Sequence, residues 1–193
     1  MSTNKLALTQ ATLNSVARTK DVIELPAVMD NWVRTYEKVT GRHDGVMRYE
    51  AEKVLFMQTV GDNKALDKCD RFTLYAAWTE LAISGLTLRD GLTYIIPYGK
   101  KASFMVGWKG RLEQINEIPT VVFTHEPVVV YDCDVFDYDL GVKTKINAHR
   151  RGKRVEGTQI THVYFVIDFT WGPEVYIMDA EDVLNIRDTY SSL

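Results

Sequence analysis

Apolar residues recur with helical spacing in the N-terminal part of the chain. Between residues 25 and 40 they fall three and four positions apart, which predicts an amphipathic helix. Further helices are predicted over residues 47–60 and 70–84, the second with Asp70 as its N-cap and Gly85 just beyond its last turn. The pattern therefore indicates a largely helical start to the chain.

The hydrophobic period changes from helical to two after residue 91. Apolar stretches at 92–98 and 102–107 flank a short turn of glycine and lysines, and this arrangement is typical of a β-hairpin. A short helix is predicted over residues 108–117. Additional strands and a final helix are predicted near residues 120–131, 142–148, 158–170, 174–178 and 180–190.

Helices followed by a run of strands indicate an α+β fold. We expect N-terminal helices packed on a small antiparallel β-sheet with a β-hairpin, a crossing helix after that hairpin, and a C-terminal helix. The chain has 193 residues, 46% of them hydrophobic, which is enough to bury a core of ordinary size. No stretch of linker-like composition interrupts it. A single domain over residues 1–193 is therefore predicted, with a mainly helical part at 1–62.

The net charge of −3 gives no general attraction for a polyanion, so a nucleic-acid site requires a local basic patch. Residues 143–154, here called the basic run, contain no acidic residue. Acidic residues cluster just before the run, and opposite charges this close in sequence suggest two faces or two ends of a hairpin. The Lys and Arg residues of the basic run are Lys143, Lys145, Arg150, Arg151, Lys153 and Arg154.

The two cysteines, Cys69 and Cys133, lie far apart in the sequence and have no metal-binding spacing. This argues against a disulfide scaffold or a structural zinc site, and a reducing cytoplasm fits such a composition. The N-terminus carries no hydrophobic signal segment, and no apolar run approaches membrane-spanning length. Neither secretion nor membrane insertion is expected.

Residues 107–111 place an aromatic side chain among glycines and basic groups. Trp108 lies between Gly107 and Lys109, and Arg111 follows. An aromatic ring beside basic side chains, on a flexible backbone, suits stacking on the bases of single-stranded nucleic acid. Packing of Trp108 into the hydrophobic core is the alternative.

The basic run is predicted to form a mobile hairpin loop that lies along phosphates. Clustered Lys and Arg side chains gain affinity for phosphates by releasing counterions, whatever the base sequence. Gly152 within the run supports a loop. The alternative is a solvated turn without a ligand. Like charges in one short segment repel one another and cost stability unless an anion compensates them, which favours phosphate binding.

Four carboxylates form an acidic cluster before the basic run. Mg²⁺ prefers such oxygen ligands, and two Mg²⁺ ions would support phosphodiester cleavage. Along a strand, however, the two halves of the cluster would lie on opposite faces, so an exposed acidic turn is the preferred interpretation. The members of the cluster are Asp132, Asp134, Asp137 and Asp139.

Other catalytic arrangements find little support in the sequence. His149 and His162 lack the context of a nucleophile or a metal site, and each is expected to be a hydrogen-bonded structural residue. The sequence contains no phosphate-binding loop of the ATPase type. A DNA transaction by this chain would therefore proceed without a nucleotide-driven motor.

Several sequence fragments occur in a fixed order between residues 63 and 192. In this order and spacing the chain resembles the RecT family of phage single-strand annealing proteins. Residues 63–193 are therefore interpreted as a RecT-like core. The fragments are Leu66–Asp70, Ile83–Leu88, Tyr94–Tyr98, Phe104–Gly110, Val130–Phe136, His149 with Thr161–Tyr164, and Ile186–Ser192.

The resemblance implies a protein that binds single-stranded DNA and anneals complementary strands without ATP in phage-type homologous recombination. Its fold would be an annealing-recombinase core like that of lambda Red beta. The implied partners are single-stranded DNA, the annealed duplex, further copies of the chain in a ring or helical filament, and a phage exonuclease. The implied setting is the cytoplasm of a bacterial host, with no enzymatic activity, cofactor or membrane. Because family members continue into a Trp-containing segment and a basic helix, the chain is expected to be short at its C-terminus.

Two further functions stay open, a Mg²⁺-dependent nuclease built on the acidic cluster and a structural phage protein that assembles with itself. In the annealing hypothesis, basic side chains contact phosphates while two aromatic side chains order the bases. The expected DNA-binding residues are Tyr98, Lys100, Lys101, Trp108, Lys109, Arg111, Lys143, Lys145, Arg150, Arg151, Lys153, Arg154 and Arg187.

Overall fold

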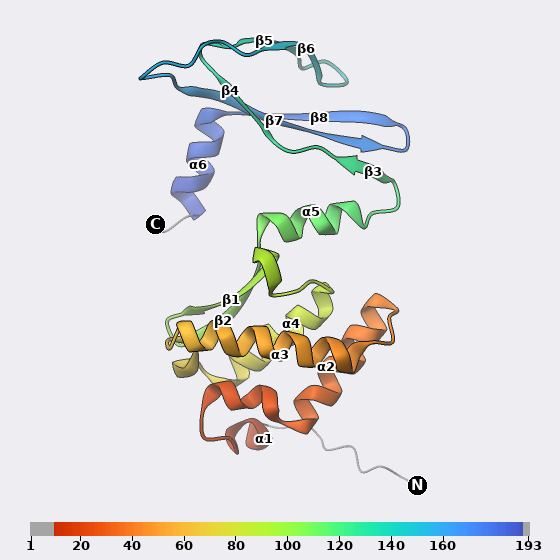
Figure 1. Cartoon of the computed structure of the whole chain (residues 1–193), viewed down its shortest axis with the longest axis vertical. Coiled ribbons are helices and arrows are strands. Elements are labelled where there is room, and N and C mark those ends of the chain that lie inside the picture. The colour runs from red at the N-terminus through yellow and green to blue at the C-terminus, as the bar shows by residue number, and fades with distance from the viewer. Residues whose placement is uncertain (1–9, 191–193) are drawn as a thin grey trace. The chain divides into compact units, whose positions relative to one another are not determined.

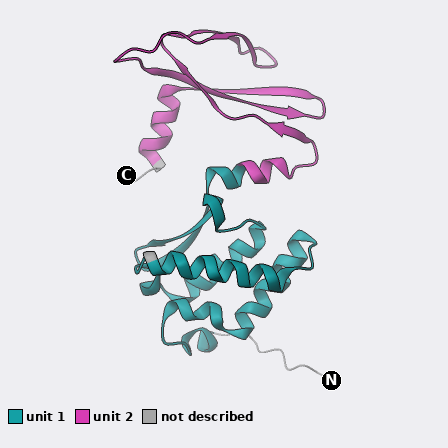
Figure 2. Ribbon diagram, in the orientation of Figure 1, with its two compact units in different colours: residues 1–111 teal, residues 112–193 magenta. Residues whose placement is uncertain are grey.

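A computed structural model describes residues 10–190 of the chain. The chain divides into two compact units, unit 1 up to Arg111 and unit 2 from Leu112 onward (Figure 2). The boundary falls inside a helix that begins in unit 1 and ends in unit 2. The prediction of one domain over the whole chain is not tested by this division and stays a prediction.

Unit 1 consists of helices followed by one β-hairpin (Figure 1). Its α-helices are α1 (Gln10–Asn14), α2 (Pro26–Thr40), α3 (Gly45–Asp62) and α4 (Arg71–Ser84). Three short 3-10 helices, η1 (Thr19–Glu24), η2 (Leu66–Lys68) and η3 (Arg89–Gly91), lie in the connections. The hairpin strands are β1 (Thr93–Tyr98) and β2 (Lys101–Val106), and α5 (Trp108–Asn116) follows them across the unit boundary.

Helix α2 forms where the apolar stripe predicts it. Pro26 is its first residue, where the missing N–H costs no hydrogen bond, and Gly41 ends it with a φ of 70°. Val28, Trp32 and Tyr36, each four residues apart, are buried on one face. This face packs α2 against α3 and α4.

Helix α4 has the ends that the sequence predicts. The Asp70 carboxylate accepts hydrogen bonds from the N–H groups of Phe72 at 2.9 Å and Thr73 at 3.1 Å. Gly85 adopts a φ of 68° just past the last turn. The helix lies at the centre of unit 1, and its buried residues are Leu74, Ala77, Trp78, Leu81 and Ala82.

An aromatic cluster fills the core between α2, α3 and α4. Trp32 and Trp78 have ring centroids 6.0 Å apart, and the Trp32 indole N–H donates to the Trp78 carbonyl oxygen at 2.8 Å. Tyr36, Tyr49 and Phe56 surround this pair with centroid distances of 5.3 to 5.7 Å. All five rings are almost completely buried. Because aromatic rings dominate the burial energetics of a core, these three helices are held as one packed body.

Unit 2 is mainly antiparallel β-sheet. One short helix, α6 (Ala180–Tyr190), follows its last strand. The strands are β3 (Val121–Thr124), β4 (Val128–Tyr131), β5 (Val135–Asp139), β6 (Lys145–Arg150), β7 (Ile160–Phe169) and β8 (Gly172–Asp179).

Strand β7 is the central strand of the larger sheet in unit 2. β3 pairs with its C-terminal end and β4 with its N-terminal half, while β8 runs antiparallel to it from His162 to Phe169. β5 and β6 form a separate hairpin that packs on β7 through Phe136, whose ring stacks on Tyr164 at a centroid distance of 5.6 Å. Figure 1 shows α6 on the side of the sheet away from this hairpin.

The predicted α+β fold class is confirmed, and two details of the predicted strands are wrong. The segment near 120–131 contains two strands and not one, because Pro127 has no N–H with which to continue the ladder. Residues 135–139, predicted as part of an acidic turn, form β5. Among residues 10–190, no helix combines the length and apolar character needed to cross a membrane.

Candidate nucleic-acid interface

The tip of the β1–β2 hairpin presents three of the predicted DNA-binding side chains. Gly99 adopts a φ of 61° in the turn, a conformation that favours glycine, and Lys100 follows it. Tyr98, the last residue of β1, lies opposite Lys101, the first residue of β2. All three side chains are exposed, and Tyr98 is 69% accessible to solvent.

Helix α4 holds the hairpin tip in place. The Asp70 N–H donates to the Lys100 carbonyl oxygen at 2.7 Å, and the Ala102 N–H donates to the Thr73 hydroxyl oxygen at 3.0 Å. Asp70 also caps α4 through its carboxylate. The backbone that carries the two lysines of the tip is therefore fixed by the central helix of unit 1.

Trp108 is the first residue of α5 and is 68% exposed. The Lys109 ammonium group lies 5.7 Å from the centroid of its ring, within the range of a cation–π contact. The alternative that Trp108 packs into the core is therefore wrong. An exposed indole ring beside a lysine is available for stacking on a nucleic-acid base.

The glycines around Trp108 permit close packing. The Gly107 N–H donates to the Leu92 carbonyl oxygen at 2.8 Å. A Cβ atom on Gly107 would overlap the Gly91 carbonyl oxygen, and one on Gly110 would overlap the Leu92 carbonyl oxygen. The expectation of a flexible backbone here is therefore wrong, because the start of α5 is packed directly against the residues that precede β1.

The hairpin separates the predicted sites of unit 1 into two groups. β1 and β2 pair from Thr93 opposite Val106 to Tyr98 opposite Lys101. Trp108 follows the open end of the hairpin, whereas the lysines lie at its tip. At the usual rise per residue, the two groups are about 17 Å apart along the strands.

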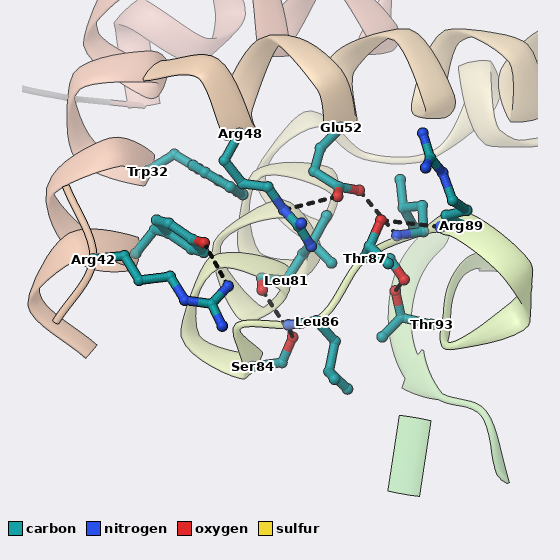
Figure 3. Close-up of polar contacts among 12 residues, drawn as sticks. Trp32, Arg42, Arg48, Glu52, Leu81, Ser84, Leu86, Thr87, Arg89 and Thr93 are labelled. Carbon is teal, nitrogen blue, oxygen red and sulfur yellow. Dashed lines mark hydrogen bonds and ion pairs between the residues drawn. The ribbon is translucent and has the colours of Figure 1, made fainter. Parts of the chain in front are cut away.

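Buried polar contacts hold the segment that leads from α4 into β1 (Figure 3). The Glu52 carboxylate on α3 is buried, with Oε1 3.0 Å from Arg48 Nε and Oε2 accepting the Leu88 N–H at 2.9 Å. Nearby, the Thr93 hydroxyl donates to the Thr87 carbonyl oxygen at 2.8 Å. A buried carboxylate requires partners of this kind, so Glu52 ties α3 to the base of the hairpin.

The basic run does not form a single loop. Lys145 to Arg150 make up β6 and pair with β5, so the acidic and basic residues lie on two strands of one hairpin. Lys143 lies in the connection between these strands, and the loop after β6 carries the remaining basic residues up to Arg154. The prediction of one mobile hairpin loop is therefore wrong in its extent. The run forms two groups at opposite ends of the β5–β6 hairpin.

The two groups of the basic run differ in their surroundings. Lys145 lies opposite Asp139 in the ladder, so an acidic residue occupies the facing position. Residues 150–154, here called the basic loop, consist of the last residue of β6 and the segment after it. They include Arg154, whose guanidinium carbon lies 3.8 Å from the centroid of the Tyr131 ring. Within residues 10–190, no ion pair joins a carboxylate to any of the four exposed basic side chains of this loop, Arg150, Arg151, Lys153 and Arg154.

The acidic cluster is divided between a turn and a strand. Asp137 and Asp139 lie on the exposed face of β5, whereas the Asp134 side chain is only 1% exposed. Hydrogen bonds from the N–H groups of Tyr131 and Gly152 are the main reason that the pKa of Asp134 is lowered to about 2. The interpretation as an exposed turn is therefore wrong for Asp134. Within the described part of the chain, no group of His, Cys, Asp and Glu side chains is arranged to hold a metal ion.

His149 and His162 are hydrogen-bonded structural residues, as predicted. His149 Nε2 lies 3.3 Å from an Asp134 carboxylate oxygen, and its Nδ1 lies 3.1 Å from the Tyr164 hydroxyl oxygen. His162 Nε2 lies 3.4 Å from the Tyr138 hydroxyl oxygen. Both imidazoles belong to the layer of rings between the β5–β6 hairpin and β7.

The remaining predicted sites are two arginines on helices. Arg111 is exposed on α5. Arg187 is exposed on α6, and its Nε donates to an Asp188 carboxylate oxygen at 2.7 Å. This contact partly neutralises the charge of Arg187, which makes it less available to a phosphate.

Sequence reasoning missed the roles of Asp134 and Tyr131. Asp134 closes a turn in which its own N–H donates to the Tyr131 carbonyl oxygen at 2.9 Å, and its carboxylate then reaches the basic loop. Tyr131 supplies the ring under Arg154. The available signal was Gly152, a residue without a side chain in the middle of four basic residues, which indicates close approach of another backbone.

Comparison with known proteins gives a family for these features. The model of the RecT family matches residues 52–192, from α3 through the last helix of the chain. No curated protein matches the chain. The match covers both ends of the β1–β2 hairpin, Trp108, the whole basic run and Asp134. The chain therefore belongs to the RecT family, whose members in general anneal single-stranded DNA in recombination.

Proposed function

We propose that this protein binds single-stranded DNA and anneals complementary strands without ATP in phage-type homologous recombination. The observation that carries the proposal is the basic loop, where four basic side chains are exposed and make no ion pair among residues 10–190. Such side chains bind the phosphates of a nucleic acid whatever its base sequence, and counterions are released as they do so. Binding is therefore expected to depend strongly on salt and weakly on base sequence.

The proposed contacts fall into two kinds. Tyr98 and Trp108 have exposed rings that offer stacking surfaces to bases, and stacking tolerates every base because each has a π-face. Basic side chains hold the phosphates, with the basic loop as the main contributor. The other proposed phosphate contacts are Lys100, Lys101, Lys109, Arg111, Lys143, Lys145 and Arg187.

Self-association into a ring or helical filament is part of the proposal. Helix α6 exposes apolar side chains, with Val183, Leu184 and Ile186 between 37% and 49% accessible. An exposed apolar stripe of this kind supports contact with a further copy of the chain. Family membership supports the other proposed partners, which are the annealed duplex and a phage exonuclease, and the cytoplasm of a bacterial host as the setting.

Strand cleavage by the acidic cluster is less well supported. The Asp134 carboxylate oxygens already accept hydrogen bonds, which a metal ion would have to displace. Asp139 accepts a hydrogen bond from Asn147 Nδ2 at 2.9 Å and lies opposite Lys145. These contacts favour a structural role for the cluster.

One assay separates the three functions. Two complementary oligonucleotides carrying a donor and an acceptor dye are mixed with the protein, without ATP, with and without Mg²⁺. Faster duplex formation is expected in both conditions, with no change for a non-complementary pair. Shortened strands that appear only with Mg²⁺ would support the nuclease. Unchanged annealing, together with self-association, would support a purely structural protein.

A further inference from the structure

The Asp134 carboxylate joins three segments of unit 2. Its Oδ2 accepts the Tyr131 N–H at 3.0 Å and lies 3.3 Å from His149 Nε2. Its Oδ1 accepts the Gly152 N–H at 2.7 Å. One buried side chain therefore connects the end of β4, the last part of β6 and the basic loop.

The contact with Gly152 lies at the centre of the basic loop, between Arg151 and Lys153. A Cβ atom at this position would overlap the Cys133 carbonyl oxygen, so only glycine allows the loop backbone to approach this closely. The loop is therefore attached at its midpoint, while the basic side chains on both sides of the glycine stay exposed.

The imidazole of His149 is itself held from two sides. Its Nε2 lies 3.3 Å from an Asp134 carboxylate oxygen, and its Nδ1 lies 3.1 Å from the Tyr164 hydroxyl oxygen. Phe136 packs edge-on against the same imidazole at a centroid distance of 5.5 Å. The His149 side chain is 9% exposed, and it links the Asp134 carboxylate to the layer of rings.

Arg154, at the far end of the basic loop, is ordered by a different contact. Its guanidinium group lies over the Tyr131 ring at 3.8 Å. The Tyr131 N–H donates to Asp134. The same carboxylate therefore fixes the backbone beneath the basic loop and beneath the ring that orients Arg154.

We propose that Asp134 is a positioning residue for DNA binding, which holds the basic loop in the conformation that meets successive phosphates. This inference rests on the proposed function. The loop carries four like charges that repel one another, so without an attachment they would spread and lose order. A loop ordered in advance loses less conformational entropy when DNA binds, and its affinity rises accordingly.

The test compares Asp134→Asn with Asp132→Asn. For Asp134→Asn, a pure charge effect predicts tighter binding of single-stranded DNA, whereas loss of positioning predicts weaker binding. Asp132 is an exposed neighbour in the same turn, and its replacement removes the same negative charge. If only charge matters, both variants bind single-stranded DNA more tightly than the unaltered protein. If Asp134 positions the loop, Asp134→Asn binds about tenfold more weakly, since several rotamer-rich side chains must then be ordered on binding.

Amide hydrogen exchange gives a readout that does not depend on DNA. The Gly152 amide is expected to be protected in the unaltered protein and unprotected in Asp134→Asn, while amides of β7 and β8 keep their protection. Tyr164→Phe is the milder second variant, since it keeps the carboxylate and removes only the hydroxyl that holds His149. We expect it to weaken DNA binding by about threefold, as for partial loss of order.

The outcomes separate this inference from the proposed function. If the unaltered protein does not bind single-stranded DNA, the proposed function fails, and protection of the Gly152 amide still reports on the attachment. If Asp134→Asn keeps a protected sheet but binds as tightly as Asp132→Asn, the positioning role is overturned. If Asp134→Asn unfolds unit 2, unchanged binding by Tyr164→Phe overturns it as well.

Discussion

The two units of this protein are stabilised in different ways. Among residues 10–190, all the buried apolar side chains lie in unit 1 except Val130 and Ile167. Both units expose large apolar side chains, but unit 1 also packs five aromatic rings between three helices, whereas unit 2 buries few apolar side chains beneath its exposed ones. Unit 2 depends instead on a ring layer and on the buried Asp134 carboxylate.

This difference suggests different roles for the two units: unit 1 supports exposed groups on a stable core, and unit 2 carries the basic loop on a sheet with little core. In unit 1 a large buried core stabilises the fold, so an exposed tryptophan and the hairpin tip can be held in fixed positions at a small cost in stability. A sheet with little core of its own gains stability from whatever covers its exposed apolar and basic surfaces, whether DNA or another copy of the chain. The following changes would break or sharpen this comparison.

Replacing Trp78 by Ala tests whether the core of unit 1 carries its stability. Trp78 is fully buried and contacts the rings of Trp32, Tyr49 and Phe56. The free energy of unfolding should fall by about 3–5 kcal/mol, as for other large-to-small changes of buried aromatic residues. Urea denaturation followed by circular dichroism measures it. Trp108→Ala is the matched control and should change stability by less than about 0.5 kcal/mol.

Replacing Ile186 by Glu tests whether the exposed stripe of α6 is covered by a second copy. Burial of an isoleucine in an interface contributes about 1.5–3 kcal/mol, so a carboxylate there should weaken self-association by at least that amount. Asn185→Glu adds the same charge to the neighbouring exposed position of the helix and should have little effect. Sedimentation velocity over a range of concentrations measures both variants. Equal assembly by the two would argue against α6 as an interface.

Replacing Trp108 by Ala tests the contribution of unit 1 to DNA binding. If the exposed indole stacks on a base, affinity for single-stranded DNA should fall by about 1–3 kcal/mol. Fluorescence anisotropy with a labelled oligonucleotide measures this loss. An unchanged affinity in a folded variant would remove Trp108 from the interface.

Acid should weaken unit 2 through Asp134. Because the pKa of Asp134 is lowered from 3.8 to about 2, its ionised form stabilises the folded state above pH 3.8. This contribution is lost as the pH falls from 3.8 through about 2. Thermal unfolding at several pH values should show a stability difference between the unaltered protein and Asp134→Asn that is constant near neutrality and shrinks in this window. A stability difference that does not change below pH 4 would contradict the stabilising role of the ionised Asp134 carboxylate.

The sequence predicts the helices of unit 1 better than the strands of unit 2. The bounds of α4 follow from Asp70 and Gly85, because caps act locally and are visible in the sequence. β5 was not predicted because Asp137 and Asp139 on its exposed face give it the composition of an acidic turn, although Phe136 and Tyr138 lie on its inner face. Alternation over five residues with acidic members is easily mistaken for a turn.

The candidate site was predictable in composition and not in arrangement. Exposure of the basic loop follows from its charge, since uncompensated Arg and Lys side chains are seldom buried. The attachment of Gly152 to Asp134 depends on residues 18 positions apart, and no local pattern reports such a contact. The tight packing of Gly107 and Gly110 against the residues just before β1 is hidden in the same way, because a glycine is equally compatible with flexibility and with close approach.

The salt dependence of single-strand affinity tests most directly whether the basic loop of unit 2 binds phosphates while Trp108 of unit 1 stacks on bases. A variant with Gln at Arg150, Arg151, Lys153 and Arg154 removes the charges of the basic loop and keeps long polar side chains. The slope of log K against log salt should become less steep by about 3, since each phosphate contact on single strands contributes about 0.7. Trp108→Ala should lower affinity without changing that slope. An unchanged slope in the Gln variant would contradict the assignment of phosphate binding to the basic loop.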